Sequence, residues 1–475
     1  MNAKPGPSWK SIVLLFLATL SVVIARPNIV VVYADDLGWK DPSYQGHPTH
    51  ETPRLDQLAA EAMVFQAAYA GAGNCAPSRA CLHSGTYTPR HGVYAVGSTT
   101  RGPKASQRLI AVPNRSGLPE KTLTLAEVLR GAGYATGLFG KWHLDGPEGA
   151  QPADQGFDVV FDPRHPNPNL RRDEPDDPKG AFSITRAALE FMKRSRAEEK
   201  PFFAFVSHHA IHSTLEARPA TLERFERKTP RKKAALYAAC LADLDTSLGI
   251  LLDALDREGM ARETMVVFTS DNGATNESSQ EPLRGNKGGY YEGGIRVPMV
   301  IRWPGKIEPG SRCGEPVHQV DLFPTFLAAA GIPWPEKHLM DGADLAPLFA
   351  GEPFSSRALF WHFPGYLDSP VRRGRPSDVD LGFRTRPVSV IRRGPWKLHL
   401  FHEEWLLDGG RASIPGNGAV ELYHLGRDEG ERKDLAADES AKRDELLDEL
   451  LLWLDKVDAP LPKVRETPNT PLEGN

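Results

Sequence analysis

Short, β-branched apolar runs alternate along this chain with segments of helical periodicity, and this alternation constrains the fold more than any other feature. The runs are apolar at nearly every position, as expected of strands whose two faces are both buried. They lie at residues 28–33, 134–139, 202–206, 265–269 and 298–301. The helical segments include a leucine stripe from Leu241 to Leu255. Strands that alternate with helices predict an α/β fold, in which helices cover both sides of a mostly parallel sheet.

The character of the sequence changes near residue 355. Three short segments beyond it are typical of antiparallel strands, and an amphipathic helical segment follows them. These segments are residues 359–363, 388–392, 396–401 and 440–454. They predict a smaller α+β domain that ends in a helix. Because 475 residues exceed one typical domain, we expect a large domain at 26–354 and a C-terminal subdomain at 355–475.

The first 25 residues have the pattern of a secretory signal peptide. Lys4 and Lys10 precede an apolar run at 12–24, and the small residue Ala25 suits cleavage. The run is short for a membrane span and no similar run follows, so we expect no stable span; an uncleaved anchor helix is the alternative. The pattern predicts a secreted or periplasmic protein. The net charge of −4 argues against nucleic acid as a partner.

The chain contains four cysteines, which is too few for a disulfide framework. They are Cys75, Cys81, Cys240 and Cys313. Two of them, Cys81 and Cys240, are interpreted as small buried apolar side chains. If Cys75 is chemically modified, the other three cysteines allow at most one disulfide bridge.

Cys75 opens a segment, Cys-Ala-Pro-Ser-Arg, that is typical of a helix start. Pro77 suits the first helical turn, where its missing N–H costs nothing. Cys75 would then lie at the positive end of the helix, which favours anions. Arg79 lies one turn further and can reach back toward residue 75. The alternative interpretation is a buried cysteine beside an ordinary helix that starts with proline.

Polar and ionisable residues follow four of the predicted strands directly. In open parallel α/β sheets, ligands bind beyond the carboxyl ends of the strands. The residues in these positions are Asp35, Asp36, Lys141, His143, His208, His209, His212, Asp271 and Asn272. Because four strands deliver such groups to one edge, the sequence predicts a single active site there.

Two of these strand ends carry hard oxygen donors. Asp35 and Asp36 follow the first strand, and Asp271 and Asn272 follow the strand at 265–269. Oxygen donors without thiolate or imidazole favour Ca²⁺, or alternatively Mg²⁺, over Zn²⁺. A strand-end turn or a helix cap explains Asp35 and Asp36 equally well when that pair is taken alone. The second pair favours a metal site.

Four segments together resemble the sulfatase family. The first is the Cys75 segment, with Leu82 and Gly85 just beyond it, and the second is FGKWHL at 139–144. The third is LRGNKGGYYEGGIRVPMVIRW at 283–303. The fourth is ELYHLGRDEGERKDLA at 421–436, with His424 where the family usually has Asp. The resemblance covers residues 27 to 437 and implies an alkaline-phosphatase-like fold, consistent with the strand pattern.

The resemblance assigns a role to each matching residue. It implies that a maturation enzyme converts Cys75 to formylglycine, whose hydrate attacks sulfur. It further implies that Asp35, Asp36, Asp271, Asn272 and residue 75 bind a divalent cation, and that Asp271 helps to deprotonate the attacking hydroxyl. By the same resemblance Arg79 holds the nucleophile, and Lys141 and Lys287 bind sulfate oxygens. His212 would protonate the leaving oxygen and His143 would act on the remaining hydroxyl.

The implied function is hydrolysis of an organic sulfate ester. Two alternatives stay open: a phosphatase or phosphonate-monoester hydrolase with the same metal core, and a catalytically silent carbohydrate-binding protein. Because the chain is expected to be exported, a sulfated oligosaccharide or polysaccharide is the preferred substrate class, followed by small aryl sulfates.

Long loops are often functional, and the loop at 162–180 is a candidate lid or substrate wall. Five arginines in loops either contact further sulfates of a polymer or form a solvated surface. They are Arg171, Arg172, Arg372, Arg373 and Arg375.

Overall fold

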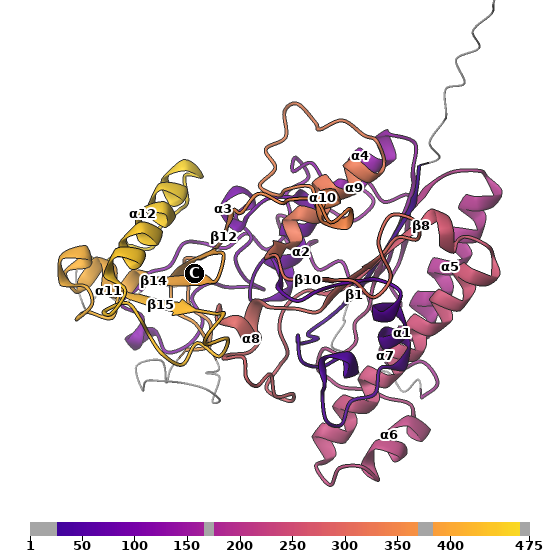
Figure 1. The fold of residues 1–475 in the computed structure, drawn as a ribbon, viewed down its shortest axis with the longest axis horizontal. Helices are drawn as coiled ribbons and strands as arrows, with labels where there is room; N and C mark the ends of the chain where they lie inside the picture. The colour runs from indigo at the N-terminus through magenta and orange to yellow at the C-terminus, as the bar shows by residue number, and fades with distance from the viewer. Residues whose placement is uncertain (1–25, 166–174, 369–382, 466–475) are drawn as a thin grey trace, which may run out of the picture.

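A computed structural model describes residues 26–165, 175–368 and 383–465 of the chain (Figure 1). The predicted signal peptide at residues 1–25 lies outside these residues. The five loop arginines, Arg171, Arg172, Arg372, Arg373 and Arg375, lie outside them as well.

The largest sheet has eight strands, and its centre is parallel as predicted. β1 (Asn28–Ala34) pairs in parallel with β7 (Phe202–Ser207) on one side and with β8 (Thr264–Ser270) on the other. β5 (Ala135–Gly140) and β6 (Val159–Phe161) continue the parallel order beyond β7. The strand-rich runs of the sequence therefore form the middle of an α/β sheet, which confirms the predicted fold class.

The opposite side of this sheet is mixed. β9 (Met299–Arg302) runs antiparallel between β8 and β2 (Met63–Phe65), and β10 (Arg312–Cys313) pairs in parallel with β2 at the edge. The sequence of β9 looks like that of the parallel strands, because burial on both faces requires apolar residues whatever the strand direction.

Helices cover both faces of the sheet (Figure 1). Ile29, Val31 and Tyr33 of β1 belong to one apolar cluster, and Val30, Val32 and Ala34 belong to the other. The first face packs against α2 (Cys75–Ser84), α4 (Leu125–Gly131) and α9 (Leu322–Ala329). The second packs against α1 (Pro53–Ala60), α5 (Ala181–Ala197) and α7 (Lys232–Arg257). Because successive side chains of a strand point to opposite faces of the sheet, one strand contributes apolar side chains to both clusters.

α7 contains the leucine stripe seen in the sequence. It is long and apolar enough to cross a membrane, but 83% of its most apolar window is buried inside the protein. Leu244, Leu248 and Leu251 lie in the same apolar cluster as the sheet residues Val30 and Val32. The stripe therefore packs the core of the large domain.

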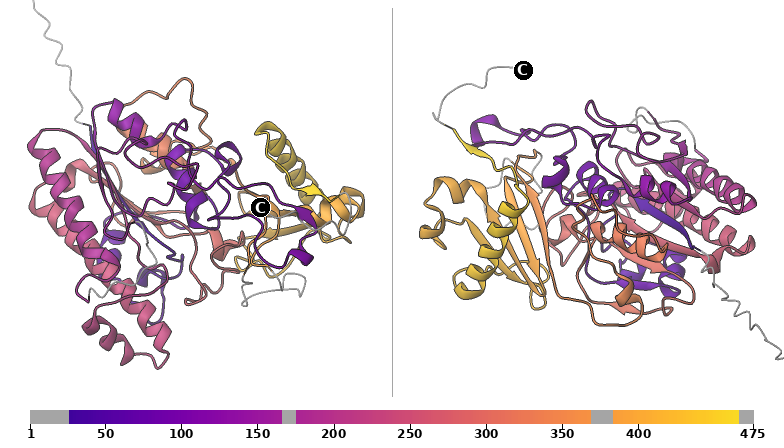
Figure 2. Two further views of the ribbon diagram at one scale, coloured as in Figure 1. Left: turned by 180° about the vertical axis from the view of Figure 1, so that it is seen from behind. Right: turned by 90° about the horizontal axis from the view of Figure 1, so that it is seen from above.

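A second sheet of four antiparallel strands follows in the C-terminal part, as predicted (Figure 2). It contains β12 (Ala358–Phe363), β13 (Val388–Arg393), β14 (Trp396–Phe401) and β15 (Val420–His424), of which only β15 was not predicted. Leu446, Leu447 and Leu450 of α12 (Ser440–Lys456) pack on this sheet. The same apolar cluster includes Tyr87 and Val320, so the sheet also packs against the first part of the chain.

The remaining elements are short. Two further two-stranded pairs join β3 (Ala68–Tyr69) to β11 (Val317–His318) and β4 (Leu109–Ile110) to β16 (Lys463–Val464). The other α-helices are α3 (Thr88–His91), α6 (Pro219–Glu226), α8 (Glu292–Ile295), α10 (Ala346–Phe349) and α11 (His402–Leu407). The described 3₁₀ turns are Ser43–Gln45, Lys104–Ser106, Pro178–Gly180, Ala261–Glu263, Gln319–Asp321 and Gly410–Ser413.

All four cysteines are buried and none forms a disulfide. Cys81 and Cys240 lie in apolar clusters, as predicted. The Cys81 sulfur also lies 3.4 Å from Nε2 of the buried His91. The core is therefore held by packing and hydrogen bonds and not by cross-links.

Candidate active site

The structure brings the four groups of strand-end residues to one place. The parallel pairing of the sheet continues just past the strands, and this fixes the backbone of each group. Asp35 N–H donates to Ala210 O at 2.9 Å, and Asp271 N–H donates to Ala34 O at 3.2 Å. Lys141 N–H donates to Ser207 O at 2.8 Å. The sheet itself therefore positions the catalytic candidates.

Three carboxylates and one amide converge at this edge, and all four side chains are completely buried. Asp36 N–H donates to Asp271 Oδ1 at 3.1 Å, and Asn272 Nδ2 donates to Asp36 Oδ1 at 2.8 Å. Oxygen atoms of Asp35 and Asp271 and the Cys75 sulfur lie within 4.8 Å of one another. Burial and the charge of Asp35 raise the pKa of Asp271 to about 7. Such a concentration of carboxylates favours a bound cation.

Two oxygen atoms in this cluster point to the same conclusion. Oδ1 of Asp35 and Oδ1 of Asn272 are buried and have no hydrogen-bond partner among the described residues. Buried polar atoms are normally hydrogen-bonded, so each one without a partner calls for an explanation. Hard carboxylate and amide oxygens are the ligands that Ca²⁺ and Mg²⁺ prefer. The residues present therefore fit a divalent cation.

Three buried cations surround the carboxylates. Lys141 Nζ lies 2.5 Å from Asp35 Oδ2, and Lys287 Nζ lies 2.7 Å from Asp36 Oδ1. Burial alone would raise the pKa of Asp35, but Lys141 and His212 hold it well below its ordinary value. Both lysines thus place positive charge beside carboxylates that remain ionised.

The third cation, Arg79, lies one helical turn after Cys75. Its Nε and Nη2 donate to Asp271 Oδ2 at 3.1 and 2.8 Å, and Nη1 donates to Ser207 Oγ at 2.6 Å. Nη1 also donates to Lys141 O at 3.0 Å. Arg79 therefore ties the helix to three strand ends.

Cys75 lies at the N-terminus of α2 and is 1% exposed. The preceding Gly73 packs against the loop of Lys287: Gly288 N–H donates to Gly73 O, and a Cβ on Gly73 would lie 2.5 Å from Gly289 O. Only glycine permits this approach. The close packing holds Cys75 and Lys287 on the same pocket wall. Burial raises the pKa of the Cys75 thiol, against the lowering effect of Lys141 and Lys287.

The three histidines after β7 have different surroundings. His212 Nε2 lies 3.8 Å from Asp36 Oδ2, and its Nδ1 contacts the Ser213 carbonyl. His209 Nε2 is hydrogen-bonded to Asp162 Oδ1 at 2.8 Å. His208 is 1% exposed, its ring nitrogens make no hydrogen bond with a described residue, and burial lowers its pKa to about 3. His212 is therefore the histidine of the three that faces the carboxylates.

His143 also faces the pocket, from the loop after β5. Its backbone has a φ of +67°, an uncommon conformation for a residue other than glycine. Burial and the charges of Lys141 and Arg79 lower its pKa, so the ring is neutral near pH 7. A neutral imidazole can accept or donate one proton.

Seven of the residues described above line a pocket of about 230 Å³, namely Asp35, Cys75, Lys141, His143, His209, His212 and Lys287. The pocket also includes residues that the sequence analysis did not single out, namely Asn74, Val96, Arg101, Lys179 and Arg384. Lys179 belongs to the predicted substrate wall at 162–180. Arg101 and Arg384 come from loops without any recognisable motif, so no local signal in the sequence indicated them.

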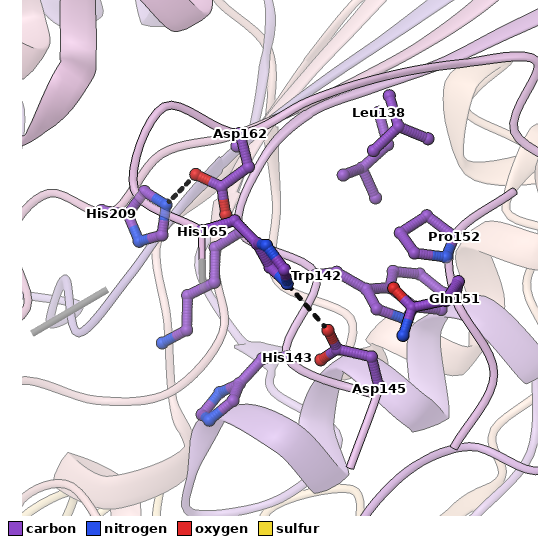
Figure 3. A pocket seen from close by; sticks show the side chains of 12 residues that line it. Leu138, Trp142, His143, Asp145, Gln151, Pro152, Asp162, His165 and His209 are labelled. Atoms are coloured by element: carbon purple, nitrogen blue, oxygen red, sulfur yellow. Dashed lines mark hydrogen bonds and ion pairs between the residues drawn. The ribbon is translucent and has the colours of Figure 1, made fainter. Parts of the chain in front are cut away.

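A second pocket of about 320 Å³ adjoins the first and shares Lys141, His143 and His209 with it (Figure 3). Trp142 and Pro152 line this pocket together with polar residues, and His165 Nε2 lies 3.5 Å from Asp145 Oδ2. The pocket therefore offers both apolar surface and hydrogen-bonding groups next to the catalytic candidates.

The sequence profile of the sulfatase family matches residues 27–332. The chain belongs to the sulfatase family. Human arylsulfatase A is 32% identical over 485 residues, which cover 92% of this chain and 89% of that protein. Dog N-acetylgalactosamine-6-sulfatase is 32% identical over 479 residues, covering 90% and 85% of the two chains.

A solved structure shows the same fold as this sulfatase. The crystal structure of Ps i-CgsB in complex with k-i-k-neocarrahexaose superposes with a TM-score of 0.71 at 25% identity, and the match covers 91% of this chain and 92% of that chain. Enzymes of this family cleave sulfate esters, so the chain is a sulfatase enzyme. The departure at His424 lies at the end of β15, where its ring packs edge-on against Trp396.

Proposed function

We propose that this sulfatase removes sulfate from a sulfated carbohydrate, with a formylglycine made from Cys75 and a divalent cation. The observation that carries the proposal is the convergence of Cys75, a cluster of hard oxygen donors and two buried lysines in one pocket. Asp35, Asp36, Asp271, Asn272 and residue 75 would hold a divalent cation, Ca²⁺ or alternatively Mg²⁺, which would supply positive charge beside the sulfate oxygens.

Residue 75 supplies the nucleophile of the reaction. A formylglycine-generating enzyme, with its own oxidant, converts Cβ of Cys75 to an aldehyde and releases the sulfur. The hydrate of that aldehyde provides a hydroxyl group at the positive end of α2. Arg79 holds the start of this helix against Asp271, so the hydroxyl is aimed into the pocket. Asp271, which bonds Arg79, is placed to accept the proton of that hydroxyl.

The two lysines bind the sulfate group. Lys141 and Lys287 extend into the pocket from different chain segments, and both are largely buried. In a pocket that excludes most water, fixed ammonium groups stabilise the negative charge that spreads over the sulfate oxygens in the transition state. These two residues are therefore expected to act on the rate of the chemical step.

His212 and His143 move the protons. The hydrate hydroxyl of residue 75 forms a bond to sulfur as the S–O bond to the alcohol breaks, and the alcohol oxygen takes a proton from His212. The sulfated hydrate then releases sulfate by C–O cleavage and returns to the aldehyde, as its remaining hydroxyl gives up a proton. Addition of water to the aldehyde re-forms the hydrate. Burial lowers the pKa of His212 to about 4, but a sulfate group beside the ring favours its protonated form. His143 acts on the remaining hydroxyl of residue 75, since its neutral ring can accept a proton.

The second pocket supports a saccharide as the leaving group (Figure 3). Its wall combines Trp142 and Pro152 with the polar side chains of Asp145, Gln151 and His165. Sugars present hydroxyls and apolar ring faces, and a mixed lining of this kind suits both. The names of the relatives, an N-acetylgalactosamine-6-sulfatase and a complex with a neocarrahexaose, point in the same direction.

Two further predictions belong to this proposal. The apolar segment at 12–24 supports export, so the enzyme acts outside the cytoplasm on such saccharides. The catalytic candidates lie in the proposed catalytic domain at 26–354, whereas the proposed C-terminal subdomain at 355–475 covers the pocket through Arg384.

The test is to produce the full-length protein with and without a formylglycine-generating enzyme and to weigh the Cys75 peptide by mass spectrometry. We expect hydrolysis of p-nitrophenyl sulfate only by protein that carries the aldehyde. Full activity from the unmodified thiol would contradict the nucleophile. Faster hydrolysis of p-nitrophenyl phosphate or a phosphonate monoester would favour a phosphatase or phosphonate-monoester hydrolase. Saccharide binding that Cys75→Ala leaves unchanged, without hydrolysis, would favour a silent carbohydrate-binding protein.

A further inference from the structure

The catalytic pocket holds more positive charge than one sulfate ester requires. Among the described residues that line it, five are lysine or arginine and one, Asp35, is a carboxylate. Lys141 and Lys287 pair with the carboxylates of the proposed metal site. Lys179 Nζ donates to the Thr214 carbonyl at 3.0 Å, so this lysine already has a partner in the chain. Arg101 and Arg384 remain as two cations without a role in the proposed chemistry.

The fold anchors the backbones of these two arginines to the same short segment of chain. Arg101 N–H donates to Tyr366 O at 3.2 Å, and Arg384 N–H donates to Leu367 O at 2.7 Å. Tyr366 and Leu367 are consecutive residues, so they hold the backbones of both arginines at neighbouring positions. Burial and the positive charge of Arg101 lower the pKa of Arg384, whereas the charges of Asp368 and Asp36 raise it. Two guanidinium groups that line one pocket repel each other, and an anion bound by both reduces that repulsion.

Arg384 also lies against the loop of the sulfate-binding candidate Lys287. A Cβ on Gly288 would lie 2.1 Å from Arg384 Cδ, and Gly288 has a φ of +90°. Only glycine combines that backbone conformation with such a close side chain. The stem of Arg384 is therefore fixed against the loop of Lys287, and both side chains line the same pocket.

The carboxylate nearest Arg101 is poorly placed to satisfy it. Asp368 Oδ1 lies 3.3 Å from Arg101 Nε, but its side chain is 47% exposed, and Nε is buried without a hydrogen bond to a described residue. Exposed ion pairs contribute little stability, because water screens them. Arg101 thus keeps a buried donor for an anion in the pocket.

We propose that Arg101 and Arg384 form a second anion subsite, which binds a carboxylate or a further sulfate carried by the same substrate molecule. The substrate is then a saccharide with at least two negative charges, and the arginines select it over singly charged esters. Guanidinium groups suit this task because they bind carboxylate and sulfate oxygens through paired N–H donors. This inference rests on the proposed sulfatase reaction and specifies its substrate class.

The experiment compares three substrates with the matured, full-length enzyme. They are N-acetylglucosamine 6-sulfate, glucosamine 2-N,6-O-disulfate, and a disaccharide of a uronic acid with N-acetylgalactosamine 6-sulfate. We expect kcat/KM to be about 10- to 100-fold higher for a doubly charged substrate, as for a charge-assisted hydrogen-bonded pair. The difference should lie mainly in KM and shrink with added salt. A preference for the disulfate would show that the subsite binds a sulfate. A preference for the uronic acid disaccharide would show that it binds a carboxylate.

Variants test whether the arginines cause the preference. Arg384→Ala and, independently, Arg101→Ala should each reduce the ratio of kcat/KM between doubly and singly charged substrates about tenfold or more. Arg384→Lys should retain part of the preference for doubly charged substrates. Arg411→Ala removes an exposed arginine that pairs with Asp448, and it should leave the ratio unchanged.

Two results would overturn the inference: equal kcat/KM for all three substrates in the wild type, or variants that slow all substrates equally. Because Arg101 and Arg384 lie on separate segments, misfolding of one variant leaves the other as a test. Hydrolysis of p-nitrophenyl sulfate is measured alongside, so that loss of the sulfatase function itself is recognised separately.

Discussion

Two buried charge clusters lie close together in this protein, and they differ in how completely their polar atoms are satisfied. In the catalytic cluster, Lys141 and Lys287 pair with Asp35 and Asp36, yet buried oxygens of Asp35 and Asn272 have no partner among the described residues. The second cluster, here the Lys397 cluster, consists of Lys397, Glu292, Glu431 and His399. No described side-chain atom of this second cluster is buried without a hydrogen bond.

The geometry of the Lys397 cluster shows how it is saturated. Lys397 Nζ lies 2.9 Å from both Glu292 Oε1 and Glu431 Oε1. Glu292 Oε2 accepts from Tyr69 at 2.7 Å, and Glu431 Oε2 accepts from Glu292 N–H at 2.6 Å. His399 Nε2 lies 3.3 Å from Glu431 Oε1. Each oxygen has a protein partner, so this cluster leaves no room for a ligand.

The difference distinguishes the catalytic cluster, which is a ligand site, from the Lys397 cluster, which is a structural contact and is called the joint below. The Lys397 cluster connects α8, which follows the Lys287 loop, with β14 of the C-terminal sheet. The cluster fixes the Lys287 loop. Because its buried polar atoms are already hydrogen-bonded, it needs no further ion. The catalytic cluster leaves oxygens and cations available to a metal and a substrate. Two motifs of the sequence, at 283–303 and 421–436, therefore meet in the joint through Glu292 and Glu431, whereas Lys287 of the first motif lies in the site.

The largest expected effect is on stability, from Lys397→Met. This change removes the cation shared by the buried Glu292 and Glu431, and breaking a buried pair in this way costs about 3–5 kcal/mol of unfolding free energy. Urea unfolding measures the loss. Lys433→Met is the control, because Lys433 and its partner Asp438 are exposed and should change stability by less than about 0.5 kcal/mol. If Lys397→Met left the free energy of unfolding unchanged, the proposed distinction between the structural joint and the catalytic site would be wrong.

Lys287→Met should act on the rate instead. Removing one fixed cation from the transition state is expected to lower kcat about 10²- to 10³-fold, equivalent to about 2.7–4 kcal/mol. Steady-state kinetics with p-nitrophenyl sulfate gives this value, and urea unfolding should show a smaller loss than Lys397→Met. Equal destabilisation by the two variants would mean that both clusters are structural.

Removal of the divalent cation should affect only the catalytic cluster. A cation present at about 100 times its Kd stabilises the folded state by about 2.7 kcal/mol, so a chelator should lower the Tm. Re-addition of Ca²⁺ or Mg²⁺ identifies the preferred ion. The variant Asp35→Asn should lose this response, whereas Lys433→Met should keep it. A chelator that changes neither Tm nor activity would contradict the metal site.

Low pH should reduce the stability of the C-terminal sheet. Burial lowers the pKa of His362 to about 4 and of His402 to about 3, while both are near 6.5 in the unfolded chain. The unfolded state then binds more protons between pH 6.5 and the folded pKa, so stability falls as the pH falls. At pH 5 each histidine should lower the free energy of unfolding by about 2 kcal/mol.

Urea unfolding at pH 7 and pH 5 checks this expectation. His402 shares the Ser389 hydroxyl with His362, each at 2.8 Å, and His402→Gln should flatten the pH dependence. A stability that rises toward pH 5 would show that these rings gain a proton in the folded state.

Much of the fold and of the candidate site was predictable because the signals are local. β1, β5, β7 and β8 agree with the apolar runs to within about two residues. The direction of β9 was not predictable, since a buried strand carries the same apolar residues in either direction. β15 was not predictable because its sequence, VELYH, mixes apolar and charged residues in a strand at the edge of the sheet.

The sequence by itself determined the parallel core and the residues at its strand ends, because apolar patterning and strand order bring those ends to one edge. Only the tertiary structure decided that Arg101 and Arg384 share a pocket and that Lys397 neutralises two glutamates. Arg101 and Arg384 lie in different loops, and Lys397 lies more than a hundred residues from Glu292 in the chain. Contacts between such distant segments depend on how whole layers pack, and no local pattern of residues encodes that.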